Sequence, residues 1–403
     1  MNNFVTLWAF LAKKGNKEFA YSIAVDSLSK FKRKPENYFT PIGLCARTLS
    51  LSFSCLLLLY SCSGKSDRVV GIKIYQYTGN ADTLVRKWKD IGINTAFVSR
   101  DLAANNFFRE VLRKNAIPTY VILPVFYNPP ALSGDSSLYA ITDEGKIAKD
   151  GWVEFVCPSR KDYRSRQISV LKEVVSDLKP DGISIDFIRQ FIFWEKIYED
   201  HPPETIHRAC YCDHCLGDFS KKYGISLPDS LGSVTEKADH LLRYHDSKWN
   251  GYRTDLITSM VQEMYDEAKK TKPNIRICIH AVPWRHADFD DAGVRVAGQD
   301  LNFLSPFADY ISPMCYSGML RRQPGWISSV VADQNKRAAD KILPSIQVYN
   351  VADSSKLDRE NFADCLQEAL RAPSQGVVFW SWPLFEKDPV RMEIAKTAIR
   401  SAD

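Results

Sequence analysis

The sequence predicts an α/β fold, a (β/α)₈ or TIM barrel with long loops on its catalytic face. From residue 68 onward, eight short apolar segments alternate with segments of helical spacing. The composition, 45% hydrophobic and 25% charged, is that of a globular protein. A doubly wound open sheet is the alternative, but it needs a Gly-rich turn after the first strand, and none follows residues 69–77.

The first half of the barrel is predicted between residues 68 and 189. Runs of apolar, β-branched and aromatic residues predict strands at 69–77, 94–99, 117–125 and 182–187. Helical spacing predicts helices at 81–91, 103–115 and 162–178. Residues 127–155 form a long loop rich in Pro, Gly, Ser and Asp, and long loops in compact domains are usually functional.

The second half begins with an insertion at about 190–246, which carries a cysteine cluster and short helical pieces. After it the alternation resumes. Strands are predicted at 275–281, 310–316, 342–349 and 377–382. Helices are predicted at 252–270, 300–307, 327–339, 360–371 and 389–400. The barrel therefore forms one domain over residues 68–403.

The fourth strand carries the first candidate for catalysis. Ile183 and Ile185 lie on one face, whereas Ser184 and Asp186 lie on the other. In a parallel barrel the chemistry lies at the carboxyl ends of the strands, and Asp186 stands where this strand ends. We predict that Asp186 is a catalytic carboxylate. The alternative is a structural aspartate that pairs with Arg189.

Polar and aromatic side chains on the inward faces of several strands predict a pocket for carbohydrate. Aromatic rings stack on the apolar faces of sugars, and Arg, Gln and His bind hydroxyl groups. The predicted substrate-binding residues are Arg189, Tyr75, His280, Tyr316, Gln347 and Trp382. For each aromatic residue taken alone, core packing is the competing interpretation.

Glycoside cleavage usually needs a second carboxyl group. Glu195 is the first choice, because the loop that carries it starts at the end of the fourth strand and also holds Phe193 and Trp194. The other candidates are Asp288, Asp290, Asp291 and Glu386. Each of these acids, taken singly, is also typical of a solvated surface charge.

The segment Cys210-Tyr-Cys-Asp-His-Cys215 has the spacing of metal ligands. With Cys157 as a fourth ligand, Cys210, Cys212 and Cys215 form a candidate structural zinc site. His214 and His207 are alternative fourth ligands. A disulfide between Cys157 and one of the three is an equally weighted alternative. No cofactor is predicted for catalysis itself.

The N-terminal region contains a predicted targeting signal. A basic flank at Arg47, a short apolar run and small residues are typical of a secretory signal, and Leu59-Tyr-Ser-Cys62 resembles a bacterial lipobox. Residues 1–67 are therefore predicted to be an extension, a lipoprotein signal and a linker, with Cys62 lipidated. The predicted location is the cell envelope, with a lipid anchor in the membrane. The net charge of +5 comes without a basic stripe, so no nucleic-acid partner is predicted.

Several of these motifs resemble those of known families. Asp181-Gly-Ile-Ser-Ile-Asp-Phe-Ile-Arg189 and Asp309-Tyr-Ile-Ser-Pro-Met-Cys-Tyr316 resemble strands four and six of the family-10-like glycoside hydrolases. The cysteine segment resembles the zinc-binding loop of family 42 β-galactosidases. The resemblance implies that Asp186 is the acid of the catalytic face and Tyr316 a pocket residue. Family 42 has acids after strands four and seven, whereas strand seven here ends Gln347-Val-Tyr349.

Together these features predict a glycoside hydrolase that acts on an extracellular or periplasmic poly- or oligosaccharide by carboxylate acid/base catalysis. The first alternative is a lipoprotein that binds carbohydrate on a barrel without catalysis. A third hypothesis is a metalloenzyme that uses the cysteine cluster.

Overall fold

The computed structural model of the 403-residue chain describes residues 68–349 and 358–402. The predicted signal and the lipidation candidate Cys62 lie outside these residues. Within the two described ranges, no helix combines the length and the apolar character needed to cross a membrane.

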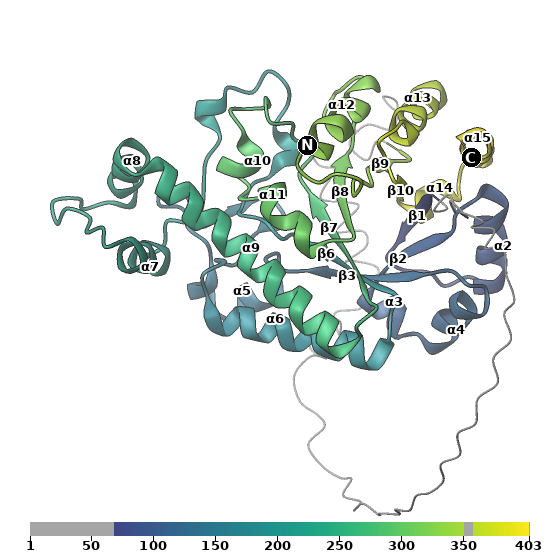
Figure 1. Cartoon of the computed structure of the whole chain (residues 1–403), viewed down its shortest axis with the longest axis horizontal. Helices are drawn as coiled ribbons and strands as arrows, with labels where there is room; N and C mark the ends of the chain where they lie inside the picture. The colour runs from purple at the N-terminus through teal and green to yellow at the C-terminus, as the bar shows by residue number, and fades with distance from the viewer. Residues whose placement is uncertain (1–67, 350–357, 403) are drawn as a thin grey trace, which may run out of the picture. The chain divides into compact units, whose positions relative to one another are not determined.

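Eight parallel strands close into a barrel, as the sequence predicts (Figure 1). They are β1 (Val69–Ile74), β2 (Thr95–Ser99), β3 (Thr119–Pro124), β6 (Gly182–Asp186), β7 (Arg276–Ala281), β8 (Tyr310–Cys315), β9 (Ser345–Gln347) and β10 (Gly376–Trp380). Each strand pairs with its neighbour in sequence order, and β1 closes the ring against β10. A short hairpin, β4 (Lys149–Asp150) and β5 (Val153–Glu154), lies in the loop after β3.

Helices follow the strands. The longer ones are α2 (Ala81–Ile91), α4 (Asn106–Lys114), α6 (Lys161–Glu173), α7 (Asp213–Tyr223), α8 (Val234–Tyr244), α9 (Asp246–Thr271), α12 (Gly325–Asn335), α13 (Arg359–Leu370) and α15 (Pro389–Ala402). Shorter helices are α3 (Arg100–Ala104), α5 (Pro129–Gly134), α10 (Ala292–Arg295), α11 (Leu301–Leu304) and α14 (Trp382–Phe385). In Figure 1, α7 and α8 extend to the left of the barrel, and α9 runs across its front.

The interior of the barrel has an apolar floor and a polar layer above it. Near the amino ends of the strands, the Phe97 ring stacks on Tyr120 with centroids 4.9 Å apart. A Cβ atom added at Gly182 would lie 2.3 Å from the Tyr120 ring, so only glycine fits this position of β6. Two residues further along the same inward face comes Ser184, and two further comes Asp186. The strand that starts beneath an aromatic ring therefore ends with a carboxylate at the mouth.

Six of the eight barrel strands end one to three residues earlier than predicted, whereas β2 and β7 end at the predicted residues. β1 ends at Ile74 rather than residue 77, and β10 ends at Trp380 rather than residue 382. The loop at 127–155, predicted without secondary structure, contains α5 and the β4–β5 hairpin. These differences move aromatic residues out of the strands, and they change which side chains face the barrel mouth.

Candidate active site

The backbone turns sharply directly after Asp186. Phe187 adopts a left-handed conformation with φ of 48°, which is unusual for a bulky residue. Its ring stacks on Tyr127 from the loop after β3, with centroids 4.7 Å apart. The half-buried Asp186 carboxylate accepts a hydrogen bond from the Phe187 N–H at 2.8 Å. Non-glycine residues in this region of φ are concentrated at functional sites.

Glu195 lies in a 3₁₀ turn, η3 (Trp194–Lys196), in the loop that follows β6. Its Oε2 atom is shielded from solvent and has no hydrogen-bond partner among the described residues. Burial raises the pKa of Glu195 to about 7; Arg189 opposes this shift, and the charge of Asp186 reinforces it. The structure therefore brings together the two carboxyl groups that the sequence singles out, and burial raises the pKa of one of them toward neutral pH.

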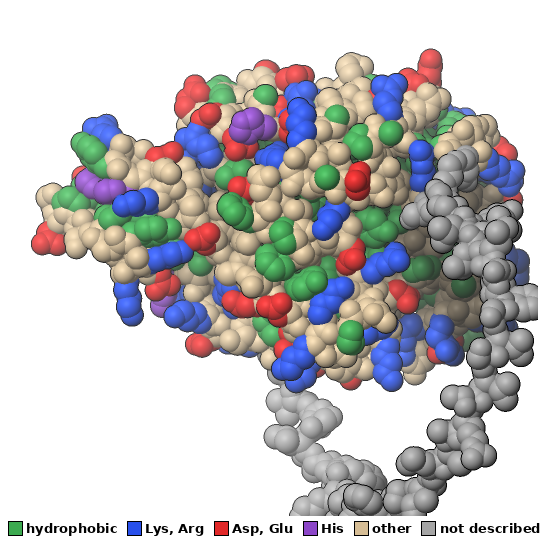
Figure 2. Space-filling model, viewed as in Figure 1, with side chains coloured by type: hydrophobic (Ala, Val, Ile, Leu, Met, Phe, Trp, Pro, Cys, Tyr) green, Lys and Arg blue, Asp and Glu red, His purple; other side chains and the backbone are tan. Residues whose placement is uncertain are grey.

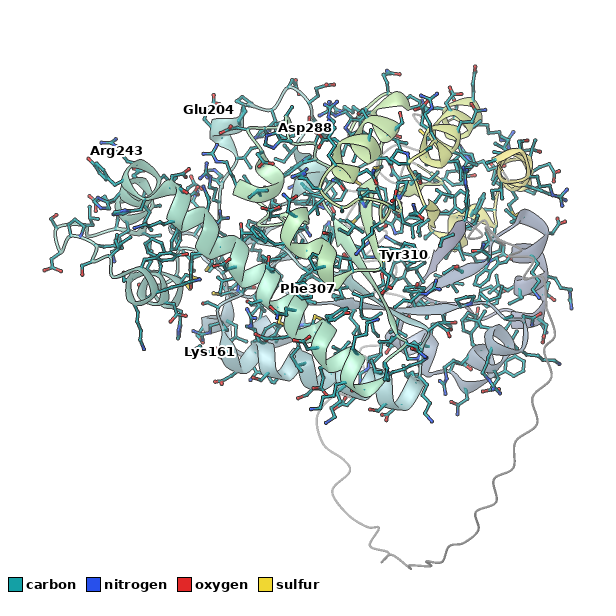
Figure 3. All side chains as sticks on the ribbon, viewed as in Figure 1. Lys161, Glu204, Arg243, Asp288, Phe307 and Tyr310 are labelled. Atoms are coloured by element: carbon teal, nitrogen blue, oxygen red, sulfur yellow. The ribbon has the colours of Figure 1, made fainter. Side chains whose placement is uncertain are left out.

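The alternative acids have different surroundings. Asp288 forms an ion pair with Arg285 at 2.7 Å in the loop after β7, and Glu386 pairs with Lys87 at 2.9 Å. Asp291 lies 3.3 Å from His286, and Asp290 pairs with Arg295. Figure 3 shows Asp288, in the loop after β7, and Glu204, in the segment after β6, in the upper part of the view. Unlike Glu195, these acids have cationic or histidine partners, so they are weaker candidates for proton transfer.

An aromatic wall stands beside the carboxylates. Trp380, the last residue of β10, stacks on Tyr316 with centroids 4.6 Å apart and an angle of 16° between the rings. Trp194 packs against the same tyrosine at 5.8 Å. Trp380 is half-buried and so leaves part of its ring exposed at the mouth. The sequence pattern favours Trp382 instead, although Trp380 lies in the same predicted strand, 377–382.

Trp382, which the sequence predicts to bind substrate, is instead a core residue. It has no exposed surface, and its ring packs edge-on against Trp88 of α2 at 5.8 Å. The reason is that β10 stops at Trp380 and Trp382 begins α14, which turns the side chain outward against the helix layer.

His280 and Gln347 are also poorly placed for direct contact with a substrate, contrary to the prediction. Both ring nitrogens of His280 are engaged: Nε2 lies 2.7 Å from Ser184 Oγ, and Nδ1 lies 3.3 Å from Lys73 Nζ. The Gln347 amide is used by the backbone, since Oε1 accepts from the Met319 N–H and Nε2 donates to the Tyr349 carbonyl. Both side chains support the site from below.

The other three predicted binding residues surround the carboxylates. The Arg189 guanidinium is 2% exposed, donates to the Ile192 carbonyl at 2.7 Å and lies over the Phe155 ring. The Tyr316 hydroxyl accepts a hydrogen bond from Lys73 at 3.3 Å. Tyr75 is half-buried, and its pKa is raised by burial and by the charge of Asp186. Of the three, Tyr75 is the most open to a ligand.

Four cysteines converge beside α6: Cys157 precedes α6, Cys210 and Cys212 precede α7, and Cys215 lies in the first turn of α7. The Sγ atoms of Cys157, Cys210, Cys212 and Cys215 all lie within 4.8 Å of one another. Cys157 Sγ lies 3.4 Å from both Cys212 Sγ and Cys215 Sγ, far beyond the roughly 2.05 Å of a disulfide bond. The predicted set of four thiols, with Cys157 from the loop after β3, is within metal-binding distance. His214 lies outside this group and instead lines a separate polar pocket with Arg160 and Asp162.

A separate groove lies far from the carboxylates. It has a volume of about 810 Å³ and is bounded by α13, α15 and Arg68, the residue before β1. Because Arg68 marks the amino end of β1, this groove is at the opposite end of the barrel from Asp186.

Figure 2 shows basic and acidic side chains interspersed on the visible face, without a continuous basic stripe.

Comparison with known proteins gives matches to solved structures only. No protein-family model and no curated protein sequence matches the chain. The glycoside hydrolase domain of PgaB (BpsB) from Bordetella bronchiseptica is similar with a TM-score of 0.62 and 12% identity, over 82% of this chain and 98% of that one. A β-galactosidase from the psychrophilic Marinomonas ef1 gives a TM-score of 0.60 and 10% identity, over 82% of this chain and 59% of that one.

A third similar structure is Gan42B, a GH42 β-galactosidase from G. stearothermophilus, with a TM-score of 0.56 and 12% identity. The match covers 84% of this chain and 57% of that chain. The chain thus spans nearly the whole PgaB domain but little more than half of the β-galactosidases. At these identities the likeness shows the fold, a TIM barrel of the kind found in glycoside hydrolases.

Proposed function

We propose that the protein is a glycoside hydrolase that cleaves a poly- or oligosaccharide with Asp186 and Glu195. The observation that carries the proposal is the contrast between the two carboxyl groups. Glu195 is desolvated, its Oε2 atom has no hydrogen-bond partner within the described part of the chain, and burial raises its pKa to about 7. Asp186 is partly open and accepts a hydrogen bond from the Phe187 N–H. Unequal environments of this kind separate an acid from a nucleophile or base.

In this mechanism Glu195 donates a proton to the leaving oxygen of the glycosidic bond. The Asp186 carboxylate then either attacks the anomeric carbon or activates a water molecule. Trp380 and Tyr75 flank the position of the sugar ring, and Arg189 fixes the loop that carries Glu195 through its bond to the Ile192 carbonyl. The fold similarity to glycoside hydrolase structures supports this assignment as an analogy.

The first experiment is a screen of soluble polysaccharides and oligosaccharides for both binding and released reducing ends. We expect at least one glycan to be cleaved by the wild type and to be bound but not cleaved by Asp186→Asn. If the wild type binds a glycan and releases no product from it, the non-catalytic binding alternative is correct. That alternative draws support from β9, where Gln347 stands in place of the acid of family 42 barrels.

We also propose that the four cysteines hold a structural zinc ion. Four thiolates are a donor set that zinc accepts in tetrahedral structural sites. The three ligands after β6 and Cys157 before α6 would join the two long loops that border the mouth. One zinc per chain by elemental analysis is the expected result. If chelation abolished hydrolysis and left the melting temperature unchanged, the metalloenzyme hypothesis would replace this one.

For location, we propose a lipid-anchored envelope protein. The support is the sequence Leu59-Tyr-Ser-Cys62, which resembles a lipobox and directly precedes a polar linker. Mass spectrometry of the protein from membranes should show a mature chain that begins at lipidated Cys62. A mature chain that retains residues before Cys62 would contradict the proposal.

A further inference from the structure

A buried lysine lies in the polar layer under the candidate active site. Lys73 of β1 is 1% exposed and forms no ion pair within salt-bridge distance among the described residues. Its Nζ lies 3.3 Å from His280 Nδ1 and 3.3 Å from the Tyr316 hydroxyl. A buried cation without a direct anionic partner is costly, so its presence requires an explanation.

The hydrogen bonds around Lys73 have a defined direction. An ammonium group only donates, so His280 Nδ1 is the acceptor, and the proton of the neutral ring lies on Nε2. His280 Nε2 then donates to Ser184 Oγ at 2.7 Å. Burial and, to a smaller extent, the charge of Lys73 lower the pKa of His280 to about 3, which agrees with a neutral ring. The network thus fixes the position of one positive charge, on Lys73.

The network lies directly beneath Asp186. Ser184 and Asp186 are two residues apart on the same inward face of β6, a separation of roughly 7 Å along a strand. The groups that interact electrostatically with Asp186 are Lys73, Tyr75, Arg189, Glu195, Cys278, His280 and Tyr316. Among them Lys73 and Arg189 are cations, and Arg189 also faces Glu195. Lys73 is therefore a cation that acts on Asp186 from the buried layer beneath it.

We propose that Lys73 is a positioning residue for the proposed reaction: a fixed cation, oriented by His280 and Tyr316, whose positive charge stabilises the negative charge of the Asp186 carboxylate. The inference rests on the proposed function, since it assigns Asp186 the role of the charged carboxylate. It explains why a charged residue interrupts the apolar strand Val69–Ile74.

The cost of burying Lys73 supports a functional role. Burial lowers the pKa of Lys73 from 10.5 to about 8, against the opposing effect of Asp186. Between pH 8 and 10.5 the unfolded chain therefore binds more protons at this residue, and the stability of the fold rises with pH over that window. At neutral pH the charged lysine weakens the fold. Residues that reduce stability in this way are typical of functional sites.

The test uses Lys73→Met and Lys73→Gln, with Lys73→Arg to retain the charge and Lys87→Met as the control. Lys87 is a surface lysine that pairs with Glu386. On the glycan cleaved by the wild type, we expect Lys73→Met and Lys73→Gln to lower kcat at least about 10-fold with little change in KM. The acid limb of kcat/KM should move to higher pH by about 1 unit, because an unassisted Asp186 takes up a proton more easily. Lys73→Arg should restore part of this shift.

A second measurement does not depend on hydrolysis. The ¹³C carboxyl signal of Asp186, assigned by its loss in Asp186→Asn, can be titrated in the wild type and in Lys73→Gln. The midpoint should lie at higher pH in Lys73→Gln and be unchanged in Lys87→Met. Equal midpoints in wild type and a folded Lys73→Gln would overturn the proposal. If the wild type cleaves no glycan but the midpoints differ, the function proposal fails, whereas the electrostatic effect of Lys73 on the Asp186 carboxylate is supported.

Discussion

The two ends of β6 carry the same residue type in two different settings. Asp181, just before the strand, is exposed and accepts a hydrogen bond from the Thr119 N–H at 2.9 Å, which ties β6 to β3. Asp186, at the other end, is half-buried among charged and aromatic side chains at the barrel mouth. The comparison teaches that position along a barrel strand, and not residue type, decides whether an aspartate binds the backbone of a neighbouring strand or faces the barrel mouth.

The same contrast recurs for other residue types. Glu195 is shielded at the mouth, whereas Glu204 of the same loop is exposed. Trp380 ends a strand, whereas Trp382 packs in the helix layer. Four cysteines converge between two loops, whereas Cys365 of α13 stays apart from them. Each pair offers a substitution at the site and a matched one outside it.

The largest effect is expected at Asp186. Asp186→Asn should lower kcat/KM about 1,000-fold or more, because an amide can act neither as nucleophile nor as base. The fold should persist, since the Asn oxygen can still accept the Phe187 N–H. Asp181→Asn should leave kcat/KM unchanged, and Asp181→Ala should lower the free energy of unfolding by about 1 kcal/mol. Kinetics and denaturant unfolding check both; full activity in Asp186→Asn would falsify its role.

Next comes the pH dependence set by Glu195. Wild-type kcat/KM should fall as the pH rises through about 7, because Glu195 loses the proton that it donates. Glu195→Gln should be about 100-fold slower and lack this alkaline limb, whereas Glu204→Gln should match the wild type.

The pH dependence of the free energy of unfolding tests the pKa of Glu195 independently of activity. The pKa of Glu195 is raised from 4.5 to about 7 on folding, so its contribution to stability is present below 4.5 and is lost as pH rises through 7. Chemical unfolding of the wild type should show this decline, and Glu195→Gln should flatten it. An equal slope in both proteins would mean that Glu195 titrates normally in the fold.

Substitutions in the cysteine cluster are expected to affect zinc content and stability more than activity. Cys215→Ser should lower bound zinc and reduce Tm by about 5 °C, because a structural metal stabilises the loops that it joins. Cys365→Ser should retain the zinc. Elemental analysis and thermal melting measure both. Zinc absent from the wild type, or retained fully in Cys215→Ser, would contradict the assignment.

The smallest effect on activity is expected at the aromatic wall. Trp380→Ala should raise KM about 5-fold with a minor change in kcat, since stacking on a sugar contributes about 1 kcal/mol. Trp382→Phe should leave KM unchanged and lower the free energy of unfolding, because it trims a buried ring that packs on Trp88. An unchanged KM in Trp380→Ala would remove this residue from the binding surface.

Much of the fold follows from local pattern. The alternation of strand and helix periods from residue 69 predicts the eight-stranded barrel, and the helix Ala81–Ile91 has the predicted bounds. The face of β6 that carries Ser184 and Asp186 is also correctly predicted, because the side chains of a strand alternate whatever surrounds them. The grouping of the four cysteines is also predicted, because Cys210, Cys212 and Cys215 have the spacing of metal ligands and the loop with Cys157 emerges at the same end of the barrel.

The sequence by itself determined the barrel, the strand that ends in Asp186 and the four thiols, because these depend on periodicity and spacing along the chain. The tertiary structure alone decided where β10 ends, and so which tryptophan faces the mouth. It also decided that His280 and Gln347 lie under the site and that Lys73 lies with them. Such choices depend on contacts between distant strands, whose desolvation and hydrogen bonds no local pattern encodes.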